Sequence, residues 1–217
     1  KEISFNFIEI ISRKSKNKIS IKNLSRLPKI LKKQVKFDLK IITSKKKNFS
    51  KLNFQKIPNI MGILNLTPDS FSDGGEFNSQ NKGIKHALQM FNLGTTIIDI
   101  GGESTRPGSK KISEKLEWKR IHKILKSICK KVPVSLDTRK ARIMERGIKL
   151  GVKIINDVSG LNYDHKSKDV IKKYKIPFVI QHSKGTPENM QNNPTYKNEL
   201  LDIYDFFEQK IKFLKKI

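Results

Sequence analysis

Short apolar runs alternate with segments of helical periodicity from residue 57 onward, and this alternation is the feature that most constrains the fold. The apolar runs are rich in β-branched residues, which favour strands, and the segments between them place apolar residues at helical spacing. Such a repeat predicts parallel strands connected by helices. We expect strands near residues 58–65, 95–100, 132–137, 152–156 and 177–182, and helices near residues 79–93, 114–130, 139–150, 166–174 and 195–216.

Local signals at the ends of these segments support the assignment. Ser113 precedes two glutamates and is an N-cap candidate, and Gly94 and Gly151 lie where helices are expected to end. Pro133 and Pro177 fall at the starts of strands, where a missing N–H is tolerated. The repeat predicts an α/β fold of the TIM (β/α)8 barrel type. Because a closed barrel needs eight strands and about 250 residues, and only about five βα units are present, we expect a partial barrel.

The composition changes near residue 57. Residues 1–56 contain 17 Lys and Arg against three Asp and Glu, and their periodicity is short or ambiguous. We predict a basic linker, or the tail of an upstream domain, over residues 1–51, and the partial barrel over residues 52–217. At the start of the barrel, Leu52–Ile57 is expected to form an alternating strand that leads into the first barrel strand.

The formal net charge of +26, from 46 Lys and Arg against 20 Asp and Glu, raises the question of a nucleic-acid partner. Proteins that recognise specific nucleic-acid sequences rely on Arg and on aromatic side chains that stack on bases, whereas Lys dominates here, so we interpret the charge as solvated Lys faces.

No apolar stretch is long enough to span a bilayer, so no membrane partner is expected. The single cysteine, Cys129, lies in an apolar helical pattern. We expect a buried thiol in a reducing, cytoplasmic compartment, or in an organelle if the source is eukaryotic.

Polar residues follow the predicted strands at the points where barrel active sites assemble. Asn65, Asp99, Asp137, Asn156 and His182 come at or just beyond the carboxyl ends of successive strands. An amide oxygen suits a hard cation, and carboxylates and amides pair with the polar groups of a ring. Each Asn and Asp of this set can equally cap its own turn, and His182 can either orient loop groups or be a structural histidine, so the spacing alone leaves both interpretations open.

Two of these junctions lie in longer motifs, MGILNLTPDSFSDGG at residues 61–75 and TTIIDIGGESTRPGS at residues 95–109. Together they resemble the signature loops of dihydropteroate synthase. This enzyme of folate biosynthesis condenses p-aminobenzoate with 6-hydroxymethyl-7,8-dihydropterin pyrophosphate to give 7,8-dihydropteroate and pyrophosphate. The resemblance implies a TIM-barrel transferase that binds a pterin, uses Mg²⁺ as a bound metal and is a target of sulfonamides.

The resemblance also implies roles for residues in both motifs. Asn65 is associated with Mg²⁺ and the pyrophosphate, and Thr105 contacts the pterin pyrophosphate. Arg106 carries a guanidinium that can hold an anion through directional hydrogen bonds. The residues that help to shape the p-aminobenzoate pocket are Ser70, Phe71 and Pro107.

The motifs SLDTRKA and IINDVSG supply the pterin side. By resemblance, Asp137 and Asn156 pair with the donors and acceptors of the ring. Asp99 and Asp157 either contact the ligand or cap the following turn. No catalytic nucleophile or proton relay is expected, because the reaction depends on positioning and on electrostatic stabilisation of the leaving pyrophosphate.

The sequence departs from the family pattern after Ile217, where the family continues with Asp-Pro-Gly-Phe-Gly, Ser-Arg-Lys and Arg-x-His segments. We therefore expect a C-terminally truncated version that is inactive by itself. Two alternatives stay open: the pterin-binding domain of a folate-dependent methyltransferase, and a non-catalytic remnant or basic binding module. The resemblance further allows a homodimer and a fused upstream hydroxymethyldihydropterin pyrophosphokinase domain as partners.

Overall fold

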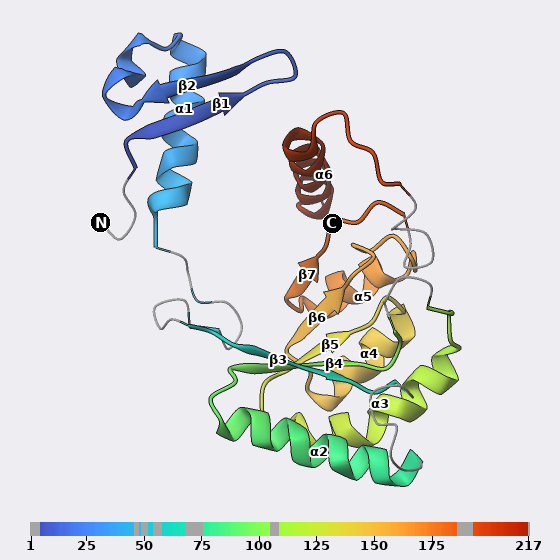
Figure 1. Cartoon of the computed structure of the whole chain (residues 1–217). Helices are drawn as coiled ribbons and strands as arrows, with labels where there is room; N and C mark the ends of the chain where they lie inside the picture. The colour runs from blue at the N-terminus through green and yellow to red at the C-terminus, as the bar shows by residue number, and fades with distance from the viewer. Residues whose placement is uncertain are drawn as a thin grey trace. The chain divides into compact units, whose positions relative to one another are not determined.

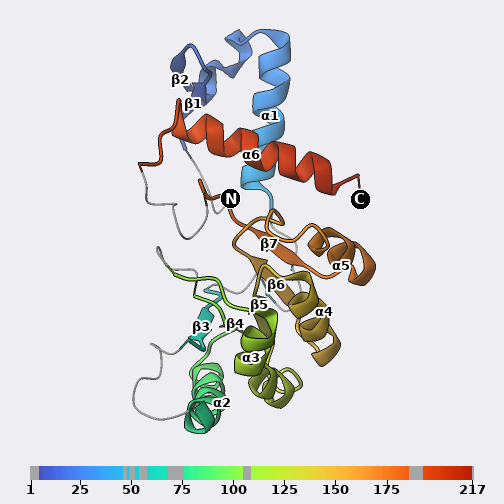
Figure 2. The same cartoon turned by 90° about the vertical axis from the view of Figure 1, so that its right-hand side faces the viewer.

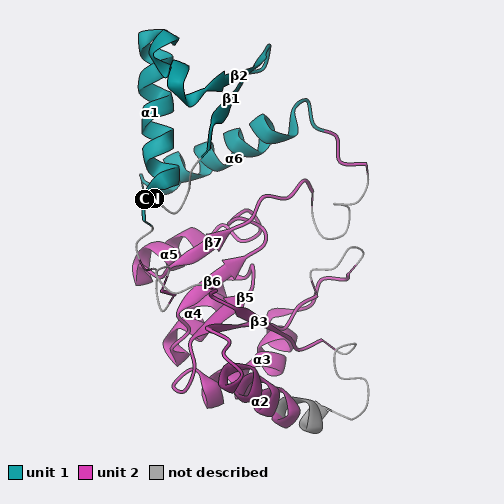
Figure 3. Cartoon of the chain, turned by 60° about the vertical axis from the view of Figure 1, so that its left-hand side comes forward, with its two compact units in different colours: residues 1–47, 196–216 teal, residues 48–195, 217 magenta. Residues whose placement is uncertain are grey.

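The chain divides into two compact units (Figure 3). Lys1–Lys47 and Tyr196–Lys216 form the first unit, and Asn48–Thr195 belong to the second. The predicted domain boundary between residues 51 and 52 stays a prediction. No helix in the described part of the chain is both long and apolar enough to cross a membrane. The computed structural model describes residues 5–45, 48, 52–53, 58–67, 76–104, 109–185 and 193–216, with the backbone alone for 76–80.

The first unit contains an antiparallel hairpin and three helices. Its elements are β1 (Phe7–Ile11), β2 (Lys16–Ser20), the 3₁₀ helix η1 (Ile21–Arg26), α1 (Lys29–Thr43) and α6 (Glu199–Leu214). The side chain of Ser20 accepts from the N–H of Lys22 at the start of η1. Arg13, in the hairpin turn, forms ion pairs with Asp202 and Asp205 of α6. These tertiary pairs join residues 189 and 192 positions apart, which local periodicity cannot indicate.

The second unit alternates strands and helices in the predicted order (Figure 1). All five predicted strands and the first four predicted helices are confirmed, with ends that differ by a few residues. The fifth predicted helix is α6 of the first unit. The elements of the second unit are β3 (Met61–Asn65), α2 (Glu76–Asn92), β4 (Ile97–Gly101), α3 (Glu114–Ile128), β5 (Val134–Asp137), α4 (Ala141–Leu150), β6 (Ile154–Asp157), α5 (Ser167–Tyr174) and β7 (Phe178–Ile180).

The strands of the second unit form one parallel sheet in the order β3-β4-β5-β6-β7. Figures 1 and 2 show helices α2 to α5 along one face of this sheet. Most strand side chains on that face are apolar, and several are fully buried, so the core lies between sheet and helices. They include Ile98, Ile100, Val134, Leu136 and Ile155. This arrangement agrees with the expectation of a partial (β/α)8 barrel.

The opposite face of the sheet carries the polar residues predicted from the sequence. Because side chains alternate along a strand, residues paired in a parallel ladder share a face. The register pairs Asn65 with Gly101, Gly101 with Asp137, and Asp137 with Asn156. These four positions therefore form one row near the carboxyl edge of the sheet, away from the helices.

Three local predictions are confirmed. Ser113 is the N-cap of α3, and its side chain accepts from the N–H of Leu116 at 3.2 Å. Gly151 ends α4 with φ of 105°, a left-handed conformation that glycine adopts without a steric penalty. Cys129 is buried, and its burial raises the pKa of the thiol to about 11.

The N-cap of α3 is testable with a matched pair of serines. Ser113→Ala is expected to lower the free energy of unfolding by about 1 kcal/mol, because the first turn of α3 loses its side-chain acceptor. Ser127→Ala is the control, since this hydroxyl only donates to the carbonyl of Lys123 within the helix. It should change the free energy by less than about 0.5 kcal/mol. Equal losses in urea unfolding curves would contradict the capping role.

Candidate functional site

The row at the carboxyl edge leaves an opening at Gly101. A Cβ atom at this position would lie 3.3 Å from Asp137 Oδ2 and 3.5 Å from Asn65 Oδ1. Because glycine has no side chain, these two oxygens flank the space above strand β4 that a Cβ atom would fill. The structure thus brings together an amide and a carboxyl group from strands that are not neighbours.

Asp99 and Asn156 meet one layer deeper, from alternate strands β4 and β6. The Nδ2 of Asn156 donates to Asp99 Oδ2 at 3.0 Å. Asp99 is only 6% exposed, and its burial raises the pKa of the carboxyl, although the side chains of Ser135 and Asn156 oppose the rise. The other oxygen, Asp99 Oδ1, is buried without a well-formed hydrogen bond to any described residue. A buried acceptor in this condition is a candidate partner for a ligand donor.

Asp137 is partly buried at the end of β5, in the most acidic part of the site. Burial raises the pKa of its carboxyl well above the usual range, and nearby carboxylates raise it further. These neighbours are Asp99, Glu117, Asp157 and Glu103. Protonation of this carboxyl therefore costs less than protonation of a solvated aspartate, and the protonated form can donate one hydrogen bond and accept others.

Asp157 lies on the other face of the sheet and has a different surrounding. Its Oδ1 accepts from the N–H and the hydroxyl of Ser159 at 2.8 and 2.7 Å. Its Oδ2 accepts from the N–H of Leu161 at 2.9 Å. Of the two aspartates for which the sequence left both roles open, Asp157 caps the turn after β6, and Asp99 faces the candidate site.

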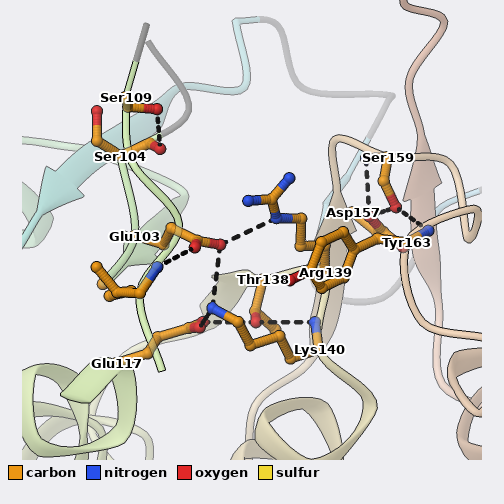
Figure 4. Close-up of polar contacts among 12 residues, drawn as sticks. Glu103, Ser104, Ser109, Glu117, Thr138, Arg139, Lys140, Asp157, Ser159 and Tyr163 are labelled. Carbon is orange, nitrogen blue, oxygen red and sulfur yellow. Dashed lines mark hydrogen bonds and ion pairs between the residues drawn. The ribbon is translucent and has the colours of Figure 1, made fainter. Parts of the chain in front are cut away.

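A network that the sequence did not predict lies beside this row (Figure 4). We call Glu103, Glu117, Arg139 and Lys140 the buried ion cluster, since their side chains are at most 6% exposed. The Nζ of Lys140 is 2.5 Å from Glu117 Oε2 and 3.1 Å from Glu103 Oε2. Arg139 Nε is 3.0 Å from the same oxygen of Glu103. Two anions and two cations are thus removed from water together, which avoids an uncompensated charge.

Glu103 also forms a hydrogen bond within the segment between β4 and α3. Its Oε1 accepts from the N–H of Ile112 at 3.0 Å, and nearby the hydroxyl of Ser109 donates to the carbonyl of Ser104 at 2.7 Å. Burial acts to raise the pKa of Glu103, but the contacts with Arg139, Ile112 and Lys140 outweigh it and lower the pKa.

Several predicted site residues cannot be compared with the structure. They lie outside the described residues, and their roles stay predictions: Ser70, Phe71, Thr105, Arg106 and Pro107. Among the described residues, no group of three or more His, Cys, Asp or Glu side chains is arranged to hold a metal ion.

The sequence held a partial signal for the buried ion cluster. Glu103 and Lys140 lie within the motifs ESTRPGS and SLDTRKA, directly after strands. Glu117, in contrast, reads as a solvated acidic residue in the first turn of α3, where the helix dipole favours it. Only its complete burial in the folded chain reveals that it pairs with Lys140.

The residues of the candidate site lie in the part of the chain that matches known proteins. The chain matches the family described as "Pterin binding enzyme" over residues 61–217. It is 42% identical over 158 residues to the dihydropteroate synthase of Clostridium beijerinckii, covering 72% of this chain and 56% of the relative. It is 39% identical over 156 residues to that of Escherichia coli, covering 71% and 55%. The chain thus spans about half the length of the curated relatives that it matches.

Solved structures agree with this assignment. The dihydropteroate synthase of Clostridium difficile, solved in the presence of pteroic acid, has a TM-score of 0.66 at 42% identity and covers 73% of this chain and 59% of its own. The Yersinia pestis dihydropteroate synthase in complex with a sulfonamide drug has a TM-score of 0.68 at 38% identity, with coverage of 73% and 58%. The family match, which extends over more than half of the chain, and these structural matches lead to one conclusion: this chain belongs to the pterin-binding enzyme family.

Proposed function

We propose that the complete gene product is a dihydropteroate synthase, which joins p-aminobenzoate to a dihydropterin pyrophosphate. The observation that carries this proposal is the hydrogen-bonded pair of Asp99 and Asn156 beside Asp137, with one buried oxygen of Asp99 that lacks a well-formed hydrogen bond to any described residue. A pterin ring presents amino and N–H donors next to acceptors, which suits this set of groups. Relatives about 40% identical to this chain, all dihydropteroate synthases, support the same reaction.

The chain's own residues would act by binding and orientation. Asp99, Asp137 and Asn156 would hold the ring, so that the exocyclic methylene faces the p-aminobenzoate pocket. The aniline nitrogen then forms a bond to that methylene, and the carbon–oxygen bond breaks with its electron pair leaving on pyrophosphate. The nitrogen finally loses a proton. Fixed polar partners also select against rings that would leave them unpaired.

Asn65 is our proposed ligand for Mg²⁺. Its Oδ1 lies beside the space that a side chain at position 101 would fill, and an amide oxygen is a donor of the kind that Mg²⁺ accepts. One or two protein oxygens suffice where substrate phosphates complete the coordination. When bound, the cation would neutralise charge on the leaving pyrophosphate.

Other parts of the proposal rest on the family resemblance. We propose that Thr105 and Arg106 hold substrate anions, and that Ser70, Phe71 and Pro107 border the p-aminobenzoate pocket. A homodimer, a fused upstream pyrophosphokinase domain and a cytoplasmic location are further proposals of the same kind.

The reaction itself is the first test. The complete gene product is expected to release pyrophosphate only when the dihydropterin pyrophosphate, p-aminobenzoate and Mg²⁺ are all present, because one site has to bind both substrates. A coupled pyrophosphate assay with each component omitted in turn measures this. Sulfonamides should raise the apparent KM for p-aminobenzoate. Turnover of the pyrophosphate ester alone, or in the presence of a chelator, would contradict the proposal.

Ring recognition is tested by binding of pteroic acid. Asp137→Asn and Asn156→Ala are each expected to weaken binding by about 1–3 kcal/mol, because a polar group of the ring loses its partner. Isothermal titration calorimetry gives the affinities, and Asn92→Ala at the exposed end of α2 is the control. Unchanged affinity in both site variants would mean that these residues only support the scaffold.

The raised pKa of Asp137 predicts a stability effect with a definite sign. Its folded pKa exceeds its unfolded value, so the folded state binds more protons between the two values, and stability falls as the pH rises through them. Asp137→Asn removes this loss and is expected to raise the melting temperature at pH 7. The gain should shrink as the pH approaches about 4, the unfolded value. A gain that does not depend on pH would contradict this explanation.

A further inference from the structure

The three residues after Asp137 are unusual in being polar and buried together. Thr138, Arg139 and Lys140 connect β5 to α4, and each is at most 5% exposed. Connections of this kind are ordinarily solvated, since buried polar groups cost free energy unless they are paired. Every one of these side chains is paired: Thr138 and Lys140 bind Glu117 of α3, and Arg139 binds Glu103, which follows β4 (Figure 4).

Thr138 and Lys140 bind the two oxygens of one carboxylate. The hydroxyl of Thr138 donates to Glu117 Oε1 at 2.6 Å, and Lys140 Nζ donates to Glu117 Oε2 at 2.5 Å. The N–H of Lys140 also donates to Thr138 Oγ1 at 3.3 Å. Since Glu117 belongs to α3, a single buried carboxylate fixes both ends of this connection to that helix.

The same connection is held on its other sides. The N–H of Thr138 donates to the carbonyl of Asn156 in β6 at 3.1 Å. Lys140 and Arg139 both bind Glu103, which follows β4. The guanidinium of Arg139 lies 4.1 Å from the centre of the Tyr163 ring. The peptide directly after Asp137 is therefore fixed to its neighbours on both sides and to α3.

Apolar side chains would hold these elements together at a lower desolvation cost than buried charges. Ion pairs and hydrogen bonds to charged groups also fix the orientation of the side chains and backbone that form them, which apolar packing does not. The orientation matters here because Asp137, the last residue of β5, faces the row with Asn65 and Asn156. A small rotation of the connection would turn its carboxyl group away from that row.

We propose that Lys140 is a positioning residue for ring recognition: by binding Glu103 and Glu117 together, it holds the connection after β5 so that the Asp137 carboxyl group faces the ligand. The inference rests on the proposed function in one respect, since it takes Asp137 as a ligand contact. Lys140 itself does not touch the ligand. Removal of Lys140 should therefore raise the KM for the dihydropterin substrate, which Asp137 binds, and leave the KM for p-aminobenzoate nearly unchanged.

The experiment compares three variants of the complete gene product with a matched control. Lys140→Met removes the buried cation, and Lys140→Arg keeps it. Thr138→Val removes the two hydrogen bonds of the hydroxyl, to Glu117 and from the N–H of Lys140, while all four charges stay. The control is Arg142→Met, because Arg142 also pairs with α3, through Glu114 at 4.0 Å, with both side chains exposed to solvent. The readouts are the KM for each substrate and the hydrogen exchange of amides 137–140 in the ligand-free protein.

Lys140→Met is expected to raise the KM for the dihydropterin substrate about tenfold, as for a lost hydrogen bond, with the KM for p-aminobenzoate nearly unchanged. Amides 137–140 should exchange faster, Lys140→Arg should restore most of both effects, and Arg142→Met should show neither. If Lys140→Met does not fold, Thr138→Val should show the same split between the two KM values, with a smaller amplitude.

Two results would overturn the inference. The first is an equal change in both KM values, or a lower melting temperature with both KM values unchanged, since either indicates a purely structural role. The second is unchanged exchange of amides 137–140, which decides the matter without any ligand. Failure of the unmodified protein to bind pteroic acid would instead refute the proposed function, and the exchange measurement would still show whether Lys140 holds this connection.

Discussion

The register of the parallel ladder is the constraint on which the rest of the second unit depends. Ladder partners share a face of the sheet, so one register places Ile98, Val134 and Leu136 against the helices and the polar residues on the opposite face. A shift by one residue would bury the aspartates among the helices and expose the isoleucines. The apolar layer thus stabilises the fold and, through the same register, aligns the candidate site.

The carboxyl edge of the sheet concentrates acidic groups, and the fold compensates them selectively. Glu103 and Glu117 are neutralised by Arg139 and Lys140, whereas Asp99 and Asp137 face the ligand side without a cation among the described residues. The first pair holds the connections between elements. The second pair has raised pKa values, and Asp99 Oδ1 lacks a well-formed hydrogen bond to any described residue, as expected of a group whose partner arrives with a ligand.

Much of the second unit was predictable because its signals are local. The N-cap at Ser113 and the left-handed C-terminal end of α4 at Gly151 depend on a few consecutive residues. The strands were predicted from short apolar runs rich in β-branched residues. The first unit gave no comparable signal, since the periodicity of residues 1–56 is short or ambiguous and α6 joins the unit through contacts with distant residues. The predicted strand at Leu52–Ile57 falls mostly outside the described residues.

The sequence by itself determined the order of the strands and helices, the class of fold, and which polar residues stand at the strand ends, because periodicity and chain position encode all three. Tertiary structure alone decided which of those residues meet. Asp99 and Asn156 lie 57 residues apart, and Glu117 and Lys140 lie 23 apart. Their contacts depend on strand order, register and the placement of α3 against the sheet. The roles of Asp99 and Asp157 diverge because β4 and β6 present them to opposite faces.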